Sequence, residues 1–194
     1  TATGKRRYVV VGLLLLLMAG VVGYYAYDLV ALRVDAWWNP WPNVYDRSFQ
    51  VVQSLYALAA GGVLGQGVGQ GAPTLIPVVH SDFVFAAIGE EWGLVGTLVT
   101  VACFALIAQR GLRIALRAIN PFRLYLAVGI TTLISVQAFM IMGGVTRLLP
   151  LTGVTLPFVS YGGSSVIAAG ITVGALLALT RTRPQGGIGD ILLR

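Results

Sequence analysis

A single aspartate stands among apolar residues in the segment 78–85, which reads Val78-Val79-His80-Ser81-Asp82-Phe83-Val84-Phe85. A carboxylate that is partly shielded from water becomes a usable general base near neutral pH. Asp is also a favoured N-cap of helices, so the residue type leaves two interpretations of Asp82, a general base or a helix cap. His80, the only histidine, could orient a carboxylate or lie at a membrane interface.

Two adjacent acids, Glu90 and Glu91, follow within an otherwise apolar stretch. Ionisable side chains near membrane depth are usually functional or paired. On a continuous helix Glu90 lies about 12 Å along the axis from Asp82, whereas the paired carboxylates of glycosidases are about 5 to 9.5 Å apart. We therefore expect Glu90 to pair with Arg47 or Arg147, or to hold a cation, rather than to form a hydrolytic pair with Asp82.

Further along the chain, Arg147 and a hydroxyl-rich segment could bind an anion. The planar guanidinium of Arg147 could clamp a diphosphate, or the residue could snorkel to the membrane surface. Segment 156–165 brings hydroxyls and backbone amides to the start of a predicted helix, which suits an anionic oxygen or, alternatively, a proline-led turn with a serine cap. The candidate substrate-binding residues are His80, Ser81, Glu90, Glu91, Arg147, Ser160, Tyr161, Gly162, Gly163 and Ser164.

The composition indicates a membrane protein. Apolar residues make up 57% of the 194 residues and charged residues only 10%, which excludes an ordinary soluble domain and a disordered chain. One cysteine and one histidine exclude a disulfide framework and a zinc finger. Four charge-free runs, 8–27, 92–109, 124–146 and 148–180, are long enough to supply helices that cross a hydrocarbon core about 30 Å thick. We therefore predict an all-α membrane protein with four transmembrane helices.

The basic residues predict the orientation of these helices. Ten lysines and arginines fall on one side of the predicted spans and three on the other, so both ends should be cytoplasmic. This asymmetry also accounts for the net charge of +6, and nucleic acid is excluded as a partner. The predicted segments are a basic lead-in (1–7), a span (8–31), a large outer loop (32–81), a span (82–109), a basic inner loop (110–123), a span (124–147), an outer loop (148–163), a span (164–180) and an inner tail (181–194).

The large outer loop contains two recognisable parts. Apolar residues recur at helical spacing over 48–60, which predicts an interfacial helix with its apolar face formed by Phe49, Val52, Leu55, Tyr56 and Ala59. A glycine-rich run follows at 61–71. No lysine follows its last glycine, so it is not a P-loop. We interpret the run as a turn in which backbone approaches backbone or ligand closely.

Three motifs of the chain resemble the SEDS family, whose members include FtsW and RodA. Segment 80–96 is similar to that family's stretch H-T-D-F-I-F-A-x-I-G-E-E-L-G-L-x-G, with Ser81 in place of Thr and Trp92 in place of Leu. Segment 152–165 resembles the second family signature, and Trp38-Asn39-Pro40-Trp41, Gln53-Ser54-Leu55 and the glycine-rich run fit the loop between. The resemblance covers about residues 30–183. Segment 42–47 departs from the pattern, which leaves the role of Arg47 open, and 143–147 is closer to RodA-type members.

The resemblance implies a peptidoglycan glycosyltransferase with about ten spans, of which this chain would supply the last four. Such an enzyme polymerises lipid II on the outer face of the bacterial cytoplasmic membrane, with a class B penicillin-binding protein as partner. The family's catalytic aspartate corresponds to Asp82, and a fragment of this size is expected to be inactive alone. No cofactor is evident, although a divalent cation (Mg or Mn) could support the leaving diphosphate.

Two other functions fit the same residues. One is a flippase or transporter of a lipid-linked precursor, and the other is a non-enzymatic scaffold for the penicillin-binding protein. The acids cluster toward the predicted outer surface, where a polymerase needs them, whereas a flippase needs polar groups at mid-bilayer. Arg110, Arg113 and Arg117 lie on one helical face, so anionic membrane lipids are expected as a further partner.

Overall fold

The computed structural model describes residues 6–46, 48–77 and 79–180. These residues form helices, turns and loops with no strand, so the predicted all-α class is confirmed. The six α-helices are α1 (Arg6–Ala26), α2 (Asp28–Trp38), α3 (Phe49–Gly61), α4 (Val84–Leu116), α5 (Pro121–Val145) and α6 (Gly163–Ala178). Single turns of 3-10 helix lie at Trp41–Asn43 and Pro73–Leu75, each with a proline near its start.

Three of these helices, α1, α4 and α5, are long and apolar enough to cross a membrane. The fourth predicted span is present as α6, but its 16 residues are shorter than a full crossing requires. At 1.5 Å per residue α6 is about 24 Å long, against a hydrocarbon core of about 30 Å. The predicted inner loop 110–123 is mostly helical. Here α4 continues to Leu116, and α5 begins after Asn120, whose side chain accepts a hydrogen bond from the Phe122 amide at 2.9 Å.

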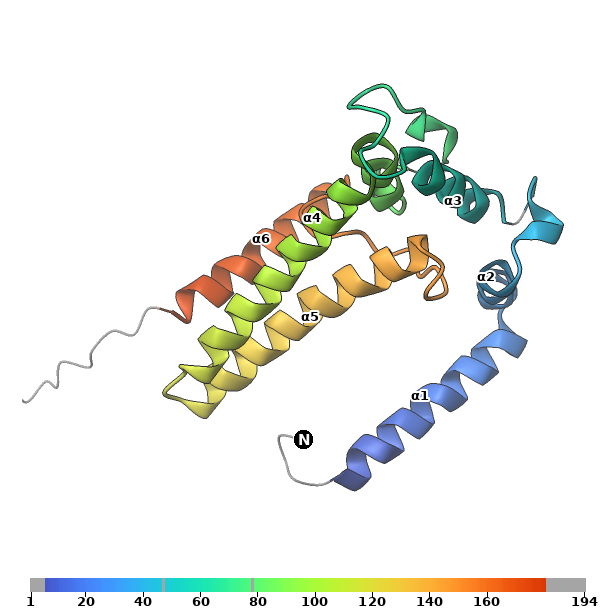
Figure 1. The fold of residues 1–194 in the computed structure, drawn as a ribbon. Helices are drawn as coiled ribbons and strands as arrows, with labels where there is room; N and C mark the ends of the chain where they lie inside the picture. The colour runs from blue at the N-terminus through green and yellow to red at the C-terminus, as the bar shows by residue number, and fades with distance from the viewer. Residues whose placement is uncertain (1–5, 47, 78, 181–194) are drawn as a thin grey trace, which may run out of the picture.

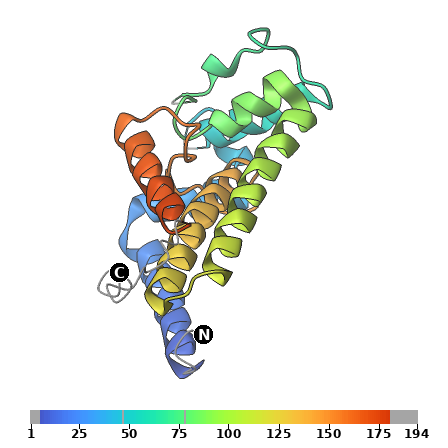
Figure 2. The ribbon, with the colours of Figure 1, turned by 90° about the vertical axis from the view of Figure 1, so that its left-hand side faces the viewer.

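α4, α5 and α6 form the main bundle (Figure 1). The view in Figure 2 shows α5 between α4 and α6, in agreement with the packing of α5 against both neighbours. α3 packs across the N-terminal part of α4, while α1 lies apart and packs mainly against α2. No residue in the apolar window of α1 is buried.

The face of α3 that packs against the bundle is distinct from the apolar face that the periodicity indicated. The helix forms where periodicity predicted it, but its buried residues are Val51, Val52, Ser54, Ala57 and Gly61. Of the predicted apolar face, Tyr56 and Ala59 are exposed. The reason is close approach of the two backbones, because a Cβ added to Gly61 would lie 1.8 Å from the Gly89 carbonyl oxygen of α4. The buried face therefore combines apolar residues with small ones that permit this close approach.

α4 is broken at Gly93, and the glycine-rich run fills the break. Gly93 has φ 65° and ψ −158°, a conformation outside the helical region that glycine adopts readily. Two helical hydrogen bonds, from residues 94 and 95 to residues 90 and 91, are thereby lost. Four bonds to the loop replace them: Leu94 N–H to Gly62 O (2.9 Å), Val95 N–H to Val63 O (3.3 Å), Gln66 N–H to Glu90 O (2.9 Å) and Gly67 N–H to Glu91 O (3.0 Å). The predicted close backbone approach is confirmed.

The loop between α5 and α6 descends beside α5. Leu156, fully buried, packs in a cluster with Phe104, Ile134, Ala138 and Ile141. Ile134 precedes the Val145 end of α5 by 11 residues, about 16 Å of helix. The amide of Gln137 donates to the Thr155 carbonyl at 2.9 Å and so supplies a partner to non-helical backbone at this depth. The segment that contains Asp82 hydrogen-bonds to this loop.

Candidate active site

Asp82 lies half-buried just before α4. The hydroxyl of Ser81 donates to its Oδ1 at 2.9 Å. The N-cap position of α4 belongs to Phe83, and among the described residues no amide of the first turn donates to the Asp82 carboxylate. The helix-cap interpretation is therefore not supported by the geometry. Within the described residues the carboxylate has one hydrogen-bond partner, and its Oδ2 makes no hydrogen bond.

Apolar anchors fix the backbone on the helix side of Asp82. Phe83 and Phe85, 1% and 3% exposed, pack in a core cluster with Ile76, Ala86 and Val145. Burying two phenylalanine side chains contributes roughly 1.5 to 3 kcal/mol each. This burial places the carboxylate at the edge of the core, next to solvent on one side and apolar side chains on the other.

Contacts with the loop before α6 fix the other side of the segment. The amide of Tyr161 donates to the His80 carbonyl at 2.8 Å. The hydroxyl of Ser160 donates to the Ser81 carbonyl, and its oxygen accepts from the Leu156 amide at 2.8 Å. The rings of His80 and Tyr161 meet edge to face, with centroids 5.6 Å apart. The two sequence motifs, about 80 positions apart, thus form one structural unit around Asp82.

The remaining residues of the second motif lie at the start of α6. Gly162 occupies the N-cap position, where no side-chain cap is present, so the predicted serine cap is replaced by glycine. Tyr161, Gly163 and Ser164 are exposed. The hydroxyls of Thr155 and Ser165 hydrogen-bond at 2.7 Å and tie the preceding loop to α6. Exposed amides and hydroxyls therefore stand beside the Asp82 segment.

Glu90 and Glu91 belong to the glycine-rich loop contact. Glu90 is 6% exposed, and its Oε1 accepts from the Ala72 amide at 2.9 Å. Its Oε2 is buried and has no hydrogen-bond partner among the described residues. Glu91 is half-buried and holds the loop through its backbone carbonyl. The structure gives Glu90 no ion pair with Arg147, and Arg47 lies outside the described residues.

Arg147 and Arg33 join α2 to the end of α5. Arg147 has φ 63°, and its guanidinium donates to the Trp38 carbonyl at 3.2 Å, while the Trp37 indole donates to the Arg147 carbonyl at 3.1 Å. Arg33 donates to the Thr152 carbonyl at 2.7 Å. Arg33 is not among the candidate functional residues selected from the sequence. It could have been noticed as a single arginine between apolar neighbours in the predicted outer loop.

A bound cation would find few protein ligands at this site. Within the described residues, no three His, Cys, Asp or Glu side chains gather as a ligand set. Asp82 is the one carboxylate next to the exposed amides of α6, and oxygen donors of this kind suit Mg²⁺ or Mn²⁺ only when substrate oxygens complete the coordination. The residues therefore fit a substrate-bridged cation better than a resident one.

Comparisons with known proteins agree with this site. The sequence profile of the FtsW/RodA/SpoVE family, described as cell cycle proteins, matches residues 1–185. Peptidoglycan glycosyltransferase RodA of Mycobacterium tuberculosis is 40% identical over 191 residues, 95% of this chain and 41% of that protein. The probable peptidoglycan glycosyltransferase FtsW of Geobacter metallireducens is 46% identical over 156 residues, 79% of this chain and 41% of that protein. The chain thus spans about two fifths of the length of these relatives.

A solved structure gives the same result. One chain of the structure described as "Structural coordination of polymerization and crosslinking by a peptidoglycan synthase complex" superposes with a TM-score of 0.69 and 30% identity, over 92% of this chain and 50% of that chain. With three helices of membrane-spanning length and relatives in bacteria, the chain is part of a multi-pass membrane protein. It belongs to the FtsW/RodA/SpoVE family of cell cycle proteins.

Proposed function

We propose that this chain carries the catalytic carboxylate of a peptidoglycan glycosyltransferase that polymerises lipid II at the outer face of the cytoplasmic membrane. The observation that carries the proposal is the environment of Asp82. Among the described residues its carboxylate caps no helix, has one oxygen without a hydrogen bond, and is fixed on both sides by buried phenylalanines and by Ser160 and Tyr161. A general base needs such fixed geometry more than it needs any other property.

The chemistry requires one base and support for a leaving anion. The hydroxyl oxygen of the acceptor sugar forms a bond to the anomeric carbon of the donor, and its proton passes to the Asp82 carboxylate. The bond between that carbon and the lipid diphosphate breaks, and the diphosphate leaves as an anion. A diphosphate is a stable leaving group, so it needs electrostatic support instead of a general acid. Two facing carboxylates, as in glycosidases, are therefore unnecessary.

The second motif is the proposed support for that diphosphate. Tyr161, Gly163 and Ser164 are exposed at the N-terminus of α6. They follow Ser160, whose hydroxyl bonds to the carbonyl of Ser81, the residue before Asp82. Helix N-termini favour anionic oxygens. A divalent cation, where one is used, would be held by Asp82 together with diphosphate oxygens and would supply the same electrostatic support.

The proposed partners follow from the relatives. A class B penicillin-binding protein would crosslink the strands, and the solved structure of a peptidoglycan synthase complex supports this pairing. Relatives named RodA and relatives named FtsW both match, so roles in elongation and in division are both compatible with the chain.

The polar groups inside the bundle do not favour the flippase alternative. Gln137 is engaged with the Thr155 carbonyl, and the hydroxyls of Thr131 and Ser135 bond to carbonyls one turn earlier on α5. Among the described residues these groups already have partners, so they do not present an open polar route. A scaffold needs no carboxylate oxygen without a hydrogen bond, and in the described structure Asp82 has one.

The test is a pair of measurements on the protein at its full encoded length in liposomes. A polymerase extends lipid II into glycan strands on the leaflet where the site opens, and gel electrophoresis of the products measures strand length. A flippase transfers fluorescent lipid II between leaflets without making polymer. Transfer without polymer, or neither activity in the presence of the partner transpeptidase, would contradict the proposal.

A further inference from the structure

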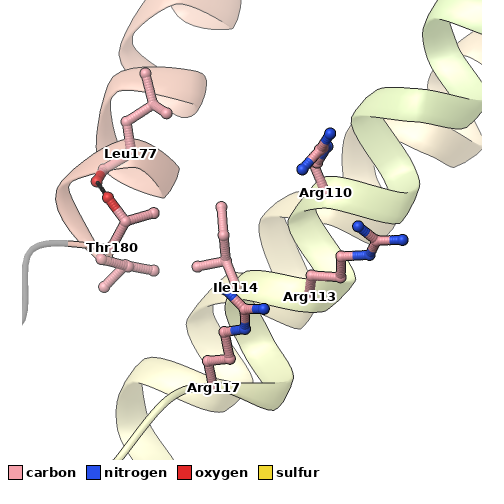
Figure 3. Close-up of a pocket in the computed structure, with 7 residues that line it drawn as sticks. Arg110, Arg113, Ile114, Arg117, Leu177 and Thr180 are labelled. Atoms are coloured by element: carbon pink, nitrogen blue, oxygen red, sulfur yellow. Dashed lines mark hydrogen bonds between the residues drawn. The ribbon is translucent and has the colours of Figure 1, made fainter.

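A cavity of about 610 Å³ lies between the C-terminal ends of α4 and α6 (Figure 3). The α4 wall carries Arg110, Arg113 and Arg117, and Figure 3 shows them across the gap from Leu177 and Thr180 at the end of α6. Arg117 follows Gly93 by 24 residues, which is about 36 Å of helix. The cavity is therefore at the opposite end of α4 from Asp82 and is separate from the proposed catalytic site.

Three unpaired positive charges on one helical face need an explanation. Within the described residues, none of the three guanidinium groups makes a hydrogen bond or an ion pair. Like charges at this spacing destabilise a helix slightly. The helix dipole favours a cation only in the last turn, which includes Arg113 but not Arg110. The cluster is thus suited to an anion that comes from outside the described chain.

The rest of the cavity is mostly apolar, because Ile114, Leu177 and Leu179 line it together with Thr180. A free phosphate ion would bind the arginines and leave these side chains against water. A phospholipid would place its phosphate on the guanidinium groups and its acyl chains along the apolar wall. Each guanidinium group can donate two parallel hydrogen bonds to phosphate oxygens. The arrangement of the donors, as well as their charge, therefore favours a phosphate.

The three arginines lie at the end of α4 that enters the predicted inner loop 110–123. They follow the charge-free run 92–109, which belongs to a helix long and apolar enough to cross a membrane. The predicted topology places the inner loop at the cytoplasmic leaflet, where anionic lipids are concentrated.

We propose that the cavity is a binding site for the headgroup of an anionic phospholipid of the inner leaflet. The phosphate lies among Arg110, Arg113 and Arg117, and the acyl chains cover the C-terminal ends of α4 and α6. The lipid thereby joins two helices whose ends the cavity separates. Each arginine contributes roughly fivefold to the affinity, and the three together roughly a hundredfold.

The experiment is native mass spectrometry of the protein at its full encoded length, purified in detergent and titrated with phosphatidylglycerol or phosphatidylcholine. The triple variant Arg110→Gln, Arg113→Gln, Arg117→Gln should lose at least about tenfold in phosphatidylglycerol affinity. The matched control is Arg123→Gln on α5, which removes one nearby charge that does not line the cavity. It should bind as the unchanged protein does, and phosphatidylcholine binding should be weak in all.

Three results would overturn the proposal. Equal affinity for the two lipids would show that the arginines do not select a charge. Displacement of phosphatidylglycerol by excess sodium phosphate would assign the cavity to a soluble anion. Phosphatidylglycerol binding that appears only after removal of residues 181–194, which contain Asp190, would show that the tail is the natural occupant. Circular dichroism of the triple variant verifies that the helices remain.

Discussion

The hydroxyl of Ser160 donates to the carbonyl oxygen of Ser81, 79 residues earlier in the chain. The same hydroxyl oxygen accepts from the Leu156 amide, so one small side chain joins the Asp82 segment to the loop that descends along α5. Ser160 is 3% exposed, and water cannot easily replace it. The position of the proposed base therefore depends on a buried residue whose hydroxyl bonds to backbone on both sides.

Ser160→Ala should lower both stability and polymerisation. The substitution leaves a buried amide and a buried carbonyl without their partner, which costs about 1 to 3 kcal/mol. Thermal unfolding followed by tryptophan fluorescence measures the stability, and lipid II polymerisation measures the rate. Ser135→Ala is the control, because that hydroxyl bonds only to a carbonyl of its own helix. Equal losses of stability and polymerisation in the two variants would contradict the inference that Ser160 positions the Asp82 segment.

Asp82→Asn should abolish polymerisation and leave the fold intact. The loss of a general base typically reduces the rate by about 10² to 10⁴. No first-turn amide of α4 depends on this carboxylate in the described structure, so the melting temperature should change little. Asp28→Asn, an exposed acid at the start of α2, is the control. Polymerisation by Asp82→Asn at the unchanged rate would place the base elsewhere, with Glu90 the next candidate.

Gly65→Ala should destabilise the protein more than Gly69→Ala. Both glycines have positive φ, 83° and 73°, so an alanine at either position carries similar backbone strain. A Cβ at Gly65 would also lie 2.1 Å from the Glu91 carbonyl oxygen, whereas nothing lies within 4 Å of one at Gly69. Overpacking adds about 1 to 3 kcal/mol at Gly65. Chemical unfolding of the two variants measures the difference, and equal losses would mean that the loop does not fill the α4 break.

Glu90→Gln should keep the stability of the protein, and Glu90→Ala should lower it. A glutamine keeps the oxygen that accepts from the Ala72 amide, while an alanine leaves that amide without its acceptor at a cost of about 1 to 3 kcal/mol. Melting temperatures of the two variants test this. A loss for Glu90→Gln as large as for Glu90→Ala would show that the second carboxylate oxygen has an essential partner outside the described residues.

Cysteine labelling tests the topology. Leu64, 80% exposed in the glycine-rich loop, and Ile119, 83% exposed between α4 and α5, are suitable reporters in a Cys103→Ser background. An impermeant maleimide should label Leu64→Cys in intact cells and Ile119→Cys only after lysis. The reverse pattern would invert the predicted orientation and place Asp82 on the cytoplasmic side.

The segments of the candidate site could be selected from the sequence because their residues carry distinct chemistry. An aspartate among phenylalanines and hydroxyls before a helix indicated Asp82, Ser160 and Tyr161 as candidates, but the residue types left base and cap both open for Asp82, and only the family resemblance favoured the base. The structure brings the two segments together. The long helices could be located because an uncharged apolar run long enough to cross a membrane has few alternative structures besides a helix.

The contacts between backbones could not be predicted. The break in α4 is completed by backbone carbonyl and amide groups of the glycine-rich loop. Backbone groups of this kind occur along the whole chain, so no side-chain pattern in the sequence indicates which segment pairs with the break. The face of α3 that packs against the bundle could not be predicted for a related reason, since Gly61 and Gly89 approach each other because they lack side chains. The link from Arg147 to Trp38 needed the three-dimensional path of the chain, because the donor and acceptor are 109 residues apart.

The insertion of the glycine-rich loop into α4 limits how this part of the chain can vary in length. Surface loops usually accept insertions and deletions. Here residues 62 and 63 pair with 94 and 95, and residues 66 and 67 pair with 90 and 91 of the same break, so only two residues connect the two halves of the contact. Adding or removing one residue between them would shift one half out of register with the other. Among relatives that keep the break, the length of this loop should therefore stay constant.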